Sequence, residues 1–280
     1  MGRAGEREVT LTVPGQLARH VALSSQSMGR RTPPSNLAVV TGTTSGIGAA
    51  LAKQLLQRGW EVAGVARRTP VLENPRYHHL AVDLGDVPMA VKSIQSRFGP
   101  LLSERAWQRV GLVNNAASAS PLGPVQNLDA HELVRLYAIN VAIPTWLMGF
   151  VVQNRHRGAM IRIVNLSSGA AVRAFPGLAA YCGGKAALRM AGMAFAAELE
   201  SPRSTATPDV AILSYEPGVV DTEMQLATRS KSQEEFPWVE TFRGFAAQGA
   251  LVAPEIPAAE IVEFLEADGR AHFIERRRGG

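Results

Sequence analysis

Short apolar runs alternate with longer segments of helical period from residue 37 to residue 274. The short runs are typical of buried strands, and the longer segments are typical of helices with one apolar face. Alternating strands and helices predict right-handed crossovers and a parallel sheet covered on both faces. The predicted strands are residues 37–40, 60–66, 79–82, 111–113, 161–166, 210–214 and 271–274, and the predicted helices are 47–58, 89–98, 129–153 with an interruption near Pro144, 180–199 and 258–265.

The two ends of the chain lack this periodicity. Residues 1–35 mix Arg, Gly, Ser and Pro, which predicts a disordered extension. One hypothesis is that translation begins at Met28, and an Arg-rich targeting segment is the weaker alternative because Glu6 and Glu8 are out of place in one. Residues 276–280 are predicted to form a solvated basic tail, which leaves one domain at residues 36–275.

Composition excludes several classes of function. The 280 residues are 46% hydrophobic and 19% charged, as in an ordinary soluble domain. The formal charge of +5 comes from basic residues at the two ends of the chain. The rest of the chain is close to neutral, so its charge does not indicate a groove that binds nucleic acid. Cys182 is the lone cysteine, which favours a reducing compartment, and no apolar run is long enough to span a membrane. We therefore predict a cytoplasmic protein without nucleic-acid or membrane partners.

A glycine-rich turn, Thr41-Gly42-Thr43-Thr44-Ser45-Gly46-Ile47-Gly48, joins the first predicted strand to the first predicted helix. In this arrangement, backbone N–H groups and a helix N-terminus receive a pyrophosphate. Surface turns also collect glycine, but the position directly after the first strand favours a dinucleotide site. The predicted cofactor residues of the turn are Gly42, Thr44, Ser45, Gly46, Ile47 and Gly48.

The end of the second predicted strand selects the nucleotide, because the ribose 2′ position falls there. The strand ends in Arg67 and Arg68, with no acid before Glu73. Two guanidiniums suit a 2′-phosphate, so NADP(H) is favoured over NAD, although a solvated basic loop is the alternative. Asp83, followed by Leu84, lies after the third strand and is interpreted either as an acceptor for the adenine amino group or as a helix N-cap.

Three polar residues surround the start of the helix at 180–199. Tyr181 and Lys185 are four positions apart and share a helix face, and Ser168 follows the fifth predicted strand. A tyrosine and a lysine at this spacing often form a surface pair, but together with the serine and the glycine turn they favour proton transfer to a carbonyl oxygen. His78 and His79 have no ligand cluster beside them, so no metal site is predicted.

These motifs, with Asn114-Asn115-Ala116 and Pro217-Gly218, occur in an order that resembles the short-chain dehydrogenase/reductase family over residues 36–275. The resemblance implies a single-domain, doubly wound Rossmann fold with a seven-stranded parallel sheet. It also implies a catalytic set of Asn140, Ser168, Tyr181 and Lys185. Ala117 stands where the family usually has glycine. The further cofactor residues that the resemblance implies are Asn115, Ala116, Pro217, Gly218, Val220 and Thr222.

The expected role of Tyr181 is to donate a proton, with Lys185 bringing its pKa from ~10 to near 7. The resemblance implies that Lys185 also holds the nicotinamide ribose, that Ser168 polarises the carbonyl, and that Asn140 holds a water linking Lys185 to solvent. The predicted function is therefore an NADPH-dependent carbonyl reductase. A cofactor-binding regulator and a longer epimerase of the same superfamily are alternatives from other classes.

The second half of the chain most resembles sepiapterin reductase and bacterial benzil reductases, in residues 181–185, 215–225 and 249–252. The resemblance implies a pterin-anchoring aspartate after Val252, where this chain has Ala253, which favours an apolar ketone or diketone over a pterin. Ser168, Tyr181, Met224 and Trp238 are the predicted substrate residues. Phe236, Trp238, Phe242 and Phe245 are interpreted equally as substrate walls or as the core of a helical pair. Family counterparts of the helices at 129–153 and 180–199 pack between subunits, which predicts a homodimer or homotetramer.

Overall fold

The computed structural model describes residues 36–200, 209–269 and 272–279. The predicted N-terminal extension, with Met28, lies outside the described residues. Residues 33–280 form one compact unit, and the architecture below is that of this unit.

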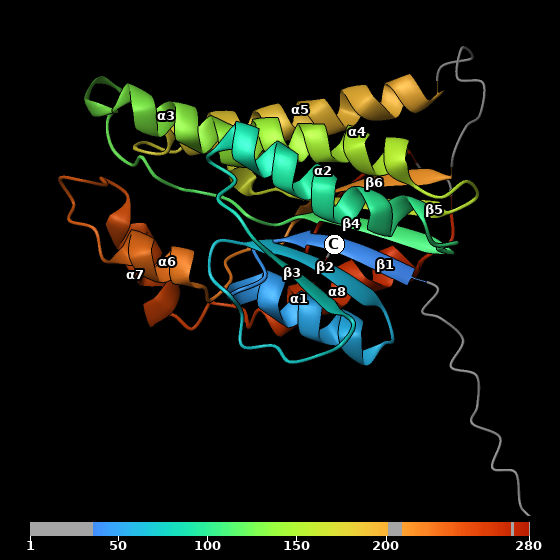
Figure 1. Cartoon of the computed structure of the whole chain (residues 1–280). Coiled ribbons are helices and arrows are strands. Elements are labelled where there is room, and N and C mark those ends of the chain that lie inside the picture. The colour runs from blue at the N-terminus through green and yellow to red at the C-terminus, as the bar shows by residue number, and fades with distance from the viewer. Residues whose placement is uncertain (1–35, 201–208, 270–271, 280) are drawn as a thin grey trace, which may run out of the picture. The chain divides into compact units, whose positions relative to one another are not determined.

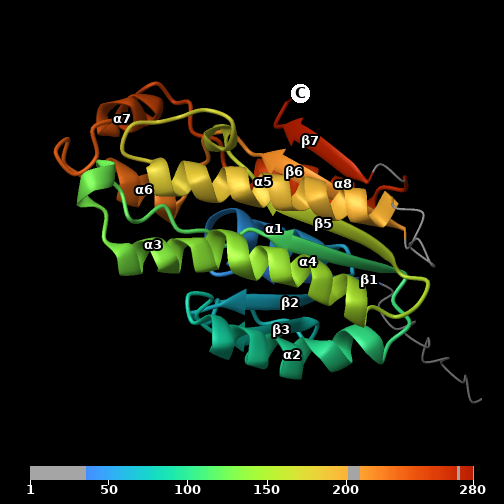
Figure 2. The same ribbon diagram turned by 90° about the horizontal axis from the view of Figure 1, so that it is seen from above.

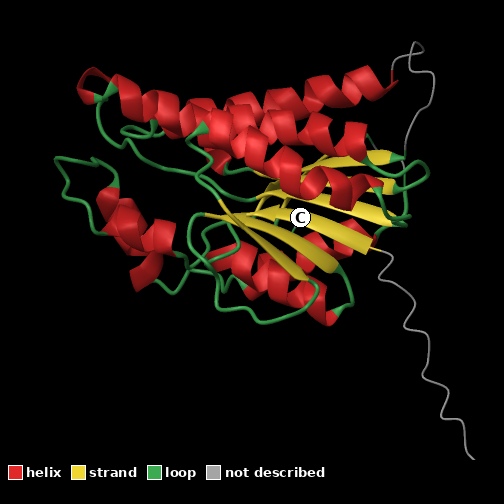
Figure 3. Ribbon diagram, viewed as in Figure 1, coloured by secondary structure: helices red, strands yellow, loops and turns green. Residues whose placement is uncertain are grey.

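Seven parallel strands form the central sheet of this unit (Figure 3). Their order is β3-β2-β1-β4-β5-β6-β7, so the chain winds outward from β1 on one side and outward from β4 on the other. The predicted doubly wound Rossmann fold is thereby confirmed. The strands are β1 (Asn36–Thr41), β2 (Glu61–Ala66), β3 (Tyr77–Ala81), β4 (Arg109–Asn114), β5 (Met160–Leu166), β6 (Val210–Glu216) and β7 (Phe273–Arg277).

Helices cover both faces of the sheet (Figure 1). Helices α2, α4 and α5 lie side by side over one face (Figure 2), and α1 and α8 pack together on the other. Each layer has its own apolar core, with Leu147 of α4 in the first and Leu51 of α1 in the second. The helices are α1 (Gly46–Gln57), α2 (Val87–Ser103), α3 (Ala130–Tyr137), α4 (Ile143–Asn154), α5 (Ala179–Glu200), α6 (Glu223–Arg229), α7 (Val239–Ala247) and α8 (Glu255–Glu266).

The predicted interruption near Pro144 is a π-helical segment, Ala138–Ala142, between α3 and α4. Pro144 has no N–H, so the carbonyl of Asn140, four residues earlier, cannot receive its α-helical hydrogen bond. The continuous stretch Ala130–Asn154 is the one described segment long and apolar enough to cross a membrane. Half of its most apolar window is buried inside the protein, as expected for a core helix.

Two parts of the C-terminal third differ from the prediction. Helices α6 and α7 were not among the predicted helices, although a helical pair was one interpretation of the aromatic residues. Both segments are short, and α7 packs through a local aromatic cluster in place of a long apolar stripe. We call residues 223–247 the lid. The last strand is Phe273–Arg277, so Arg276 and Arg277 pair with β6 and do not belong to a solvated tail. Charged side chains suit this strand because it lies at the edge of the sheet.

Candidate active site

A cavity of about 1240 Å³ opens at the carboxyl edge of the strands, beside the reversal of strand order at β1 and β4. Ligands bind doubly wound sheets at this place, because the loops that follow the strands diverge there. Nearly all the predicted site residues line the cavity, and the exceptions are Gly48 and Asn140. The lining residues among them are Gly42, Thr44, Ser45, Gly46, Ile47, Arg67, Arg68, Asp83, Leu84, Asn115, Ala116, Ser168, Tyr181, Lys185, Pro217, Gly218, Val220, Thr222, Met224 and Trp238.

The glycine turn needs its glycines for two different reasons. Gly42 and Gly46 have φ angles of 75° and 53°, a region that side chains other than glycine rarely adopt. Gly48 has an ordinary φ, but an added Cβ would lie 2.1 Å from the carbonyl oxygen of Gly42. Gly48 therefore permits the close packing of α1 against the turn and contributes no surface to the cavity.

Asn115 fixes the turn to the end of β4. Its Nδ2 donates to the carbonyl oxygens of Thr41 at 2.8 Å and Gly42 at 3.1 Å. In return, the Oγ1 of Thr41 accepts hydrogen bonds from the backbone N–H groups of Asn115 and Ala116, both at 3.0 Å. These four hydrogen bonds hold the two strand ends in one arrangement, which preorganises the turn for a ligand.

The first turn of α1 faces the cavity with free backbone donors. Ser45 is the N-cap residue in an extended conformation, and its side chain makes no capping hydrogen bond. The first N–H groups of α1 therefore stay available to an anion, as in other pyrophosphate sites. Thr222 lies directly across from this turn, since an added Cβ on Gly46 would meet its Cγ2 at 2.9 Å. The cofactor residues predicted on either side of the cavity thus lie against each other.

Arg67 and Arg68 are exposed at the end of β2 and line the cavity. Arg68 forms an ion pair with Glu223 of the lid at 2.8 Å, and both side chains are well exposed. Exposed pairs of this kind contribute little energy, so the guanidinium can exchange partners. The position and charge of the two arginines fit a phosphate group on the nucleotide.

Asp83 is not a helix N-cap. Asp86 caps α2 by accepting from the N–H of Met89, whereas Asp83 accepts from the N–H of Gly85 at 2.8 Å and from Arg135 at 2.6 Å. These hydrogen bonds, with the nearby charge of Arg67, lower the pKa of Asp83 in spite of its partial burial. The carboxylate lines the cavity in a fixed orientation, as an adenine acceptor would require. Sequence reasoning missed Arg135, because nothing in the sequence indicates that α3 reaches the loop after β3.

Ser168, Tyr181 and Lys185 lie together on one wall of the cavity. Ser168 begins a short turn after β5, where its Oγ accepts from the N–H of Ala170 at 3.2 Å. Its side chain is close enough to Tyr181 to act on the pKa of the phenol. The Nζ of Lys185 lies 5.6 Å from the centre of the Tyr181 ring and donates to the carbonyl oxygen of Leu166 at 2.5 Å. The predicted juxtaposition of the end of β5 with the first turn of α5 is present in the structure. The arrangement offers two hydroxyls to one small polar group.

The electrostatics of this wall differ from the prediction. Burial raises the pKa of Tyr181 to about 12, although the side chain of Ser168 acts in the opposite direction. Burial also lowers the pKa of Lys185 to about 8. Burial therefore opposes the expected fall of the Tyr181 pKa, because loss of hydration disfavours the charged phenolate. That Lys185 brings this pKa near 7 stays a prediction.

Replacing Lys185 with methionine is expected to stabilise the folded protein at pH 7 by up to about 3 kcal/mol, at ~1.36 kcal/mol per pKa unit. Below pH 8 Lys185 is charged in both the folded and the unfolded protein, so the full cost of burying its ammonium lowers the stability of the folded state. Between pH 8 and 10.5 the folded protein releases this proton first, so its stability rises with pH and the advantage of the variant fades. Thermal unfolding across this range measures the difference.

Lys53→Met is the matched control, because Lys53 is an exposed lysine of α1 and its removal is expected to change stability little at any pH. The carbonyl of Leu166 loses its donor in Lys185→Met, which reduces the gain. A Lys185→Met protein that unfolds at a lower temperature than the native protein at pH 7 would contradict the proposed cost of the buried charge.

Asn140 is buried behind this wall, in the π-helical segment. Its side chain exchanges two hydrogen bonds of 2.8 Å with the backbone of Ser118, and it packs against Gly184, the neighbour of Lys185. The side-chain amide thereby fixes the loop after β4. Because Pro144 has no N–H, the backbone carbonyl of Asn140 lacks its ordinary α-helical donor.

The lid covers the cavity opposite α5 and carries an aromatic cluster. Phe236 is buried in the lid core, where it contacts Phe242 edge to face at 5.3 Å between ring centres. Trp238, Phe242 and Phe245 line the cavity, and Trp238 packs edge to face on Phe175 at 5.4 Å. Phe236 thus belongs to the core of the lid, and the other three rings belong to the cavity wall, where contact with a substrate stays a prediction. The same end of the cavity is also lined by the charged side chains of Lys231, Glu234 and Glu235.

The family profile for short chain dehydrogenases matches residues 36–233, which span β1, the glycine turn and the wall formed by Ser168, Tyr181 and Lys185. The chain belongs to the short-chain dehydrogenase/reductase family. It is accordingly an oxidoreductase of a family that uses NAD(P)(H) and acts on small molecules.

Individual relatives of this short-chain dehydrogenase cover almost the whole chain. A benzil reductase forming (S)-benzoin, from Bacillus subtilis (strain 168), is 31% identical over 243 residues, which are 85% of this chain and 98% of the relative. A sepiapterin reductase from Xenopus tropicalis is 29% identical over 256 residues, covering 84% and 92%. The crystal structure of a short-chain dehydrogenase/reductase from Burkholderia vietnamiensis is 32% identical, covers 71% of this chain and 90% of that one, and superposes with a TM-score of 0.61.

Ala253 does not line the cavity of this short-chain dehydrogenase. The residue before it takes part in a short parallel bridge between Val220 and Val252. That the alanine at this position favours a ketone over a pterin stays a prediction.

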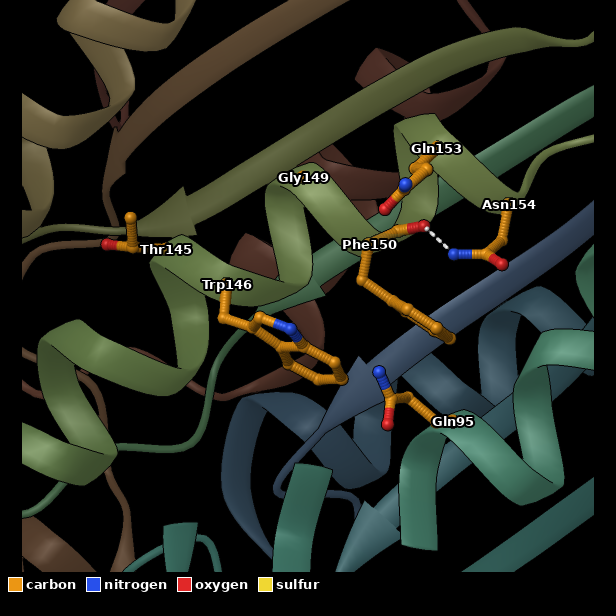
Figure 4. Close-up of a pocket in the computed structure, with 7 residues that line it drawn as sticks. All are labelled: Gln95, Thr145, Trp146, Gly149, Phe150, Gln153 and Asn154. Carbon is orange, nitrogen blue, oxygen red and sulfur yellow. Dashed lines mark hydrogen bonds between the residues drawn. The ribbon is translucent and has the colours of Figure 1, made fainter. Parts of the chain in front are cut away.

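A second hollow of about 600 Å³ lies at the surface between α2 and α4 (Figure 4). Trp146 and Phe150 stack there at 4.9 Å, and Asn154 donates to the carbonyl oxygen of Phe150 at 2.8 Å. No predicted site residue lines it, and its lining has no titratable side chain. It therefore offers no group for proton transfer, and the chemistry of this short-chain dehydrogenase belongs to the larger cavity.

Proposed function

We propose that this protein is an NADPH-dependent carbonyl reductase that converts a ketone or diketone to an alcohol. The observation that carries the proposal is that the hydroxyls of Ser168 and Tyr181 line one cavity together with Lys185 and the glycine turn. Two hydroxyls can hold a carbonyl oxygen while one of them gives it a proton.

Tyr181 is proposed as the proton donor. Bound NADPH would supply the hydride, and the oxygen of the reduced carbonyl then needs a proton. A phenol with a pKa of about 12 stays protonated at every physiological pH and remains a stronger acid than an alcohol, so transfer to the substrate oxygen is favourable. Oxidation of an alcohol would require the phenolate as a base, which burial opposes. The site therefore favours the reductive direction.

Lys185 and Asn140 are proposed to supply the proton that Tyr181 has donated. With a pKa of about 8, the ammonium of Lys185 can release and regain a proton near neutral pH. Asn140, whose side chain packs against Gly184, is proposed to hold the water that connects this ammonium to solvent, through the carbonyl that lacks an α-helical donor. The same ammonium would donate hydrogen bonds to the nicotinamide ribose hydroxyls of bound NADPH.

The residues on the cofactor side fit NADPH. The close packing at Gly48 and the free N–H groups of α1 suit the pyrophosphate. Arg67 and Arg68 suit the 2′-phosphate, since each guanidinium offers a fork of donors to a phosphate oxygen pair.

The substrate side supports an apolar carbonyl compound. Trp238, Phe242 and Met224 supply walls that match aryl or alkyl groups. The benzil reductase relatives support the same class, and pterin reduction remains the second candidate because sepiapterin reductases are also similar.

A substrate panel tests this proposal. NADPH consumption is expected to be fastest with aryl diketones such as benzil, slower with aryl monoketones, and slowest with sepiapterin. Preferential reduction of sepiapterin would replace the ketone assignment by the pterin one. Binding of NADPH without turnover of any carbonyl would instead support a cofactor-binding regulator.

A further inference from the structure

Glu223, the first residue of the lid, joins the lid to the loop after β2 through an ion pair. It begins α6 and lines the cavity, as Arg68 does. Its Oε2 accepts a hydrogen bond from Nη2 of Arg68 at 2.8 Å, although the two residues are 155 positions apart in the chain. A carboxylate of the protein therefore already binds one of the two arginines that fit the 2′-phosphate of the cofactor.

Both partners of this ion pair belong to segments that contact the glycine turn. The N–H of Gly42 donates to the carbonyl oxygen of Val65 at 2.7 Å, which fixes the turn to the end of β2, three residues before Arg68. On the other side, Thr222 directly precedes Glu223 and is the N-cap residue of α6. Its Cγ2 lies 2.9 Å from the position of a Cβ added to Gly46. The ion pair is therefore located beside the predicted cofactor site on both sides.

Arg67 and Arg68 differ in the partners that they have. Among the described residues, Arg68 forms its ion pair with Glu223, whereas Arg67 has no ion pair of its own. The charge of Arg67 acts on Asp83, but that carboxylate is already held by Arg135 at 2.6 Å. A phosphate group that binds at the end of β2 therefore meets one arginine without a hydrogen-bonded acid and one arginine with such an acid.

A phosphate and a carboxylate compete for the same guanidinium donors. Both groups accept from the planar fork of an arginine. When Arg68 donates to a 2′-phosphate, Glu223 loses its partner and lies close to a second negative group. Both changes oppose the binding of the phosphate. Neither change arises with NADH, because its ribose has an uncharged 2′-hydroxyl and Arg68 can keep Glu223 as its partner.

We propose that Glu223 competes with the 2′-phosphate of NADPH for Arg68 and thereby limits the preference of the protein for NADPH over NADH. This inference rests on the proposed NADPH-dependent function. Glu223 is a specificity-determining residue whose effect has the opposite sign to that of the two arginines. The side chains of Arg68 and Glu223 are 65% and 62% exposed, so the exchange of partners costs little and Glu223 reduces the preference without abolishing it.

Glu223→Gln tests the proposal, because glutamine keeps the shape of the side chain and removes its charge. Fluorescence titrations with NADPH and with NADH, in the absence of a ketone, give two dissociation constants that do not depend on turnover. The variant is expected to bind NADPH roughly 2-fold to 5-fold more tightly at low ionic strength, as for the loss of an exposed ion pair. Its affinity for NADH should stay unchanged. The gain should fade near 1 M salt, where the screening length is about 3 Å.

Glu240→Gln is the matched control, since Glu240 is an exposed acid in the first turn of the other lid helix, α7. It pairs with Arg243 and does not line the cavity, so its loss should alter neither dissociation constant. In a protein that already carries Arg68→Ala, Glu223→Gln should lose most of its gain, because the competition needs the arginine.

The outcomes separate this inference from the proposed function. An unchanged NADPH affinity in Glu223→Gln, an equal gain with NADH, or a full gain in the absence of Arg68 would overturn the role of Glu223 while the preference for NADPH stands. Structural damage cannot imitate the expected result, because it would weaken nucleotide binding. Equal affinities for NADPH and NADH in both the native protein and Glu223→Gln would refute the proposed choice of cofactor itself.

Discussion

Replacing Tyr181 with phenylalanine is expected to lower kcat for ketone reduction by roughly 10²-fold to 10⁴-fold. The substitution removes only the hydroxyl that gives the substrate oxygen its proton. The ring should keep its place, because it packs against Leu178 and Phe236 of the local core and below the ammonium of Lys185. NADPH affinity is therefore expected to change little. Steady-state kinetics with benzil, together with a fluorescence titration of NADPH, measure the two effects separately.

Tyr137→Phe is the control for the Tyr181 variant. The hydroxyl of Tyr137 lies beside Gly183 of α5, two residues after Tyr181, but Tyr137 does not line the cavity. Its loss should leave kcat nearly unchanged. If Tyr181→Phe kept more than about a tenth of native turnover, the loss of kcat would be smaller than the loss expected when a general acid is removed. Tyr181 would then have to be removed from the mechanism.

The double substitution of Arg67 and Arg68 by alanine is expected to raise KM for NADPH roughly 10-fold to 100-fold and KM for NADH less than about 3-fold. The two arginines are exposed, so a contact with the 2′-phosphate is screened more than a buried one, and the lower part of this range is favoured at physiological salt. Initial rates with both cofactors at a fixed, saturating ketone concentration give the ratio directly.

Arg243→Ala serves as the matched control for charge, because Arg243 is a lid arginine that does not line the cavity. Its effect on the two cofactors should be equal and small. The expected preference also depends on salt, since phosphate recognition by exposed arginines weakens as ionic strength rises. Equal increases in both KM values for the double variant would show that Arg67 and Arg68 do not select NADPH.

The central fold could be predicted because the buried strands are continuous apolar runs. β4 and β5, for example, are almost fully buried on both faces, which leaves a clear signal in the sequence. The lid could not be predicted in the same way, because α6 and α7 are short and owe their packing to Phe236 and its aromatic neighbours. The edge strand β7 was placed too early, since its pairing with β6 involves charged residues such as Arg276.

Within the candidate site, sequence order indicated which residues meet but not their electrostatic state. Ser168, Tyr181 and Lys185 line one wall as expected. The depth of burial that raises the pKa of Tyr181 could not be read from spacing, because it depends on the packing of α5 against the loop after β5. Asn140 and Pro144 are a signal that the sequence did offer, because a proline four residues after an asparagine in a helix removes the ordinary α-helical donor of that carbonyl.

The missing α-helical donor at Asn140 has a cause that the other polar groups of the site do not share. Tyr181 and Lys185 change charge with pH, and a serine side chain can rotate away from its partner. At Asn140 the cause is a covalent feature of the chain, the ring of Pro144, so neither titration nor a rotamer change restores that donor. If the proposed water binds there, its acceptor would be the same before and after each turnover.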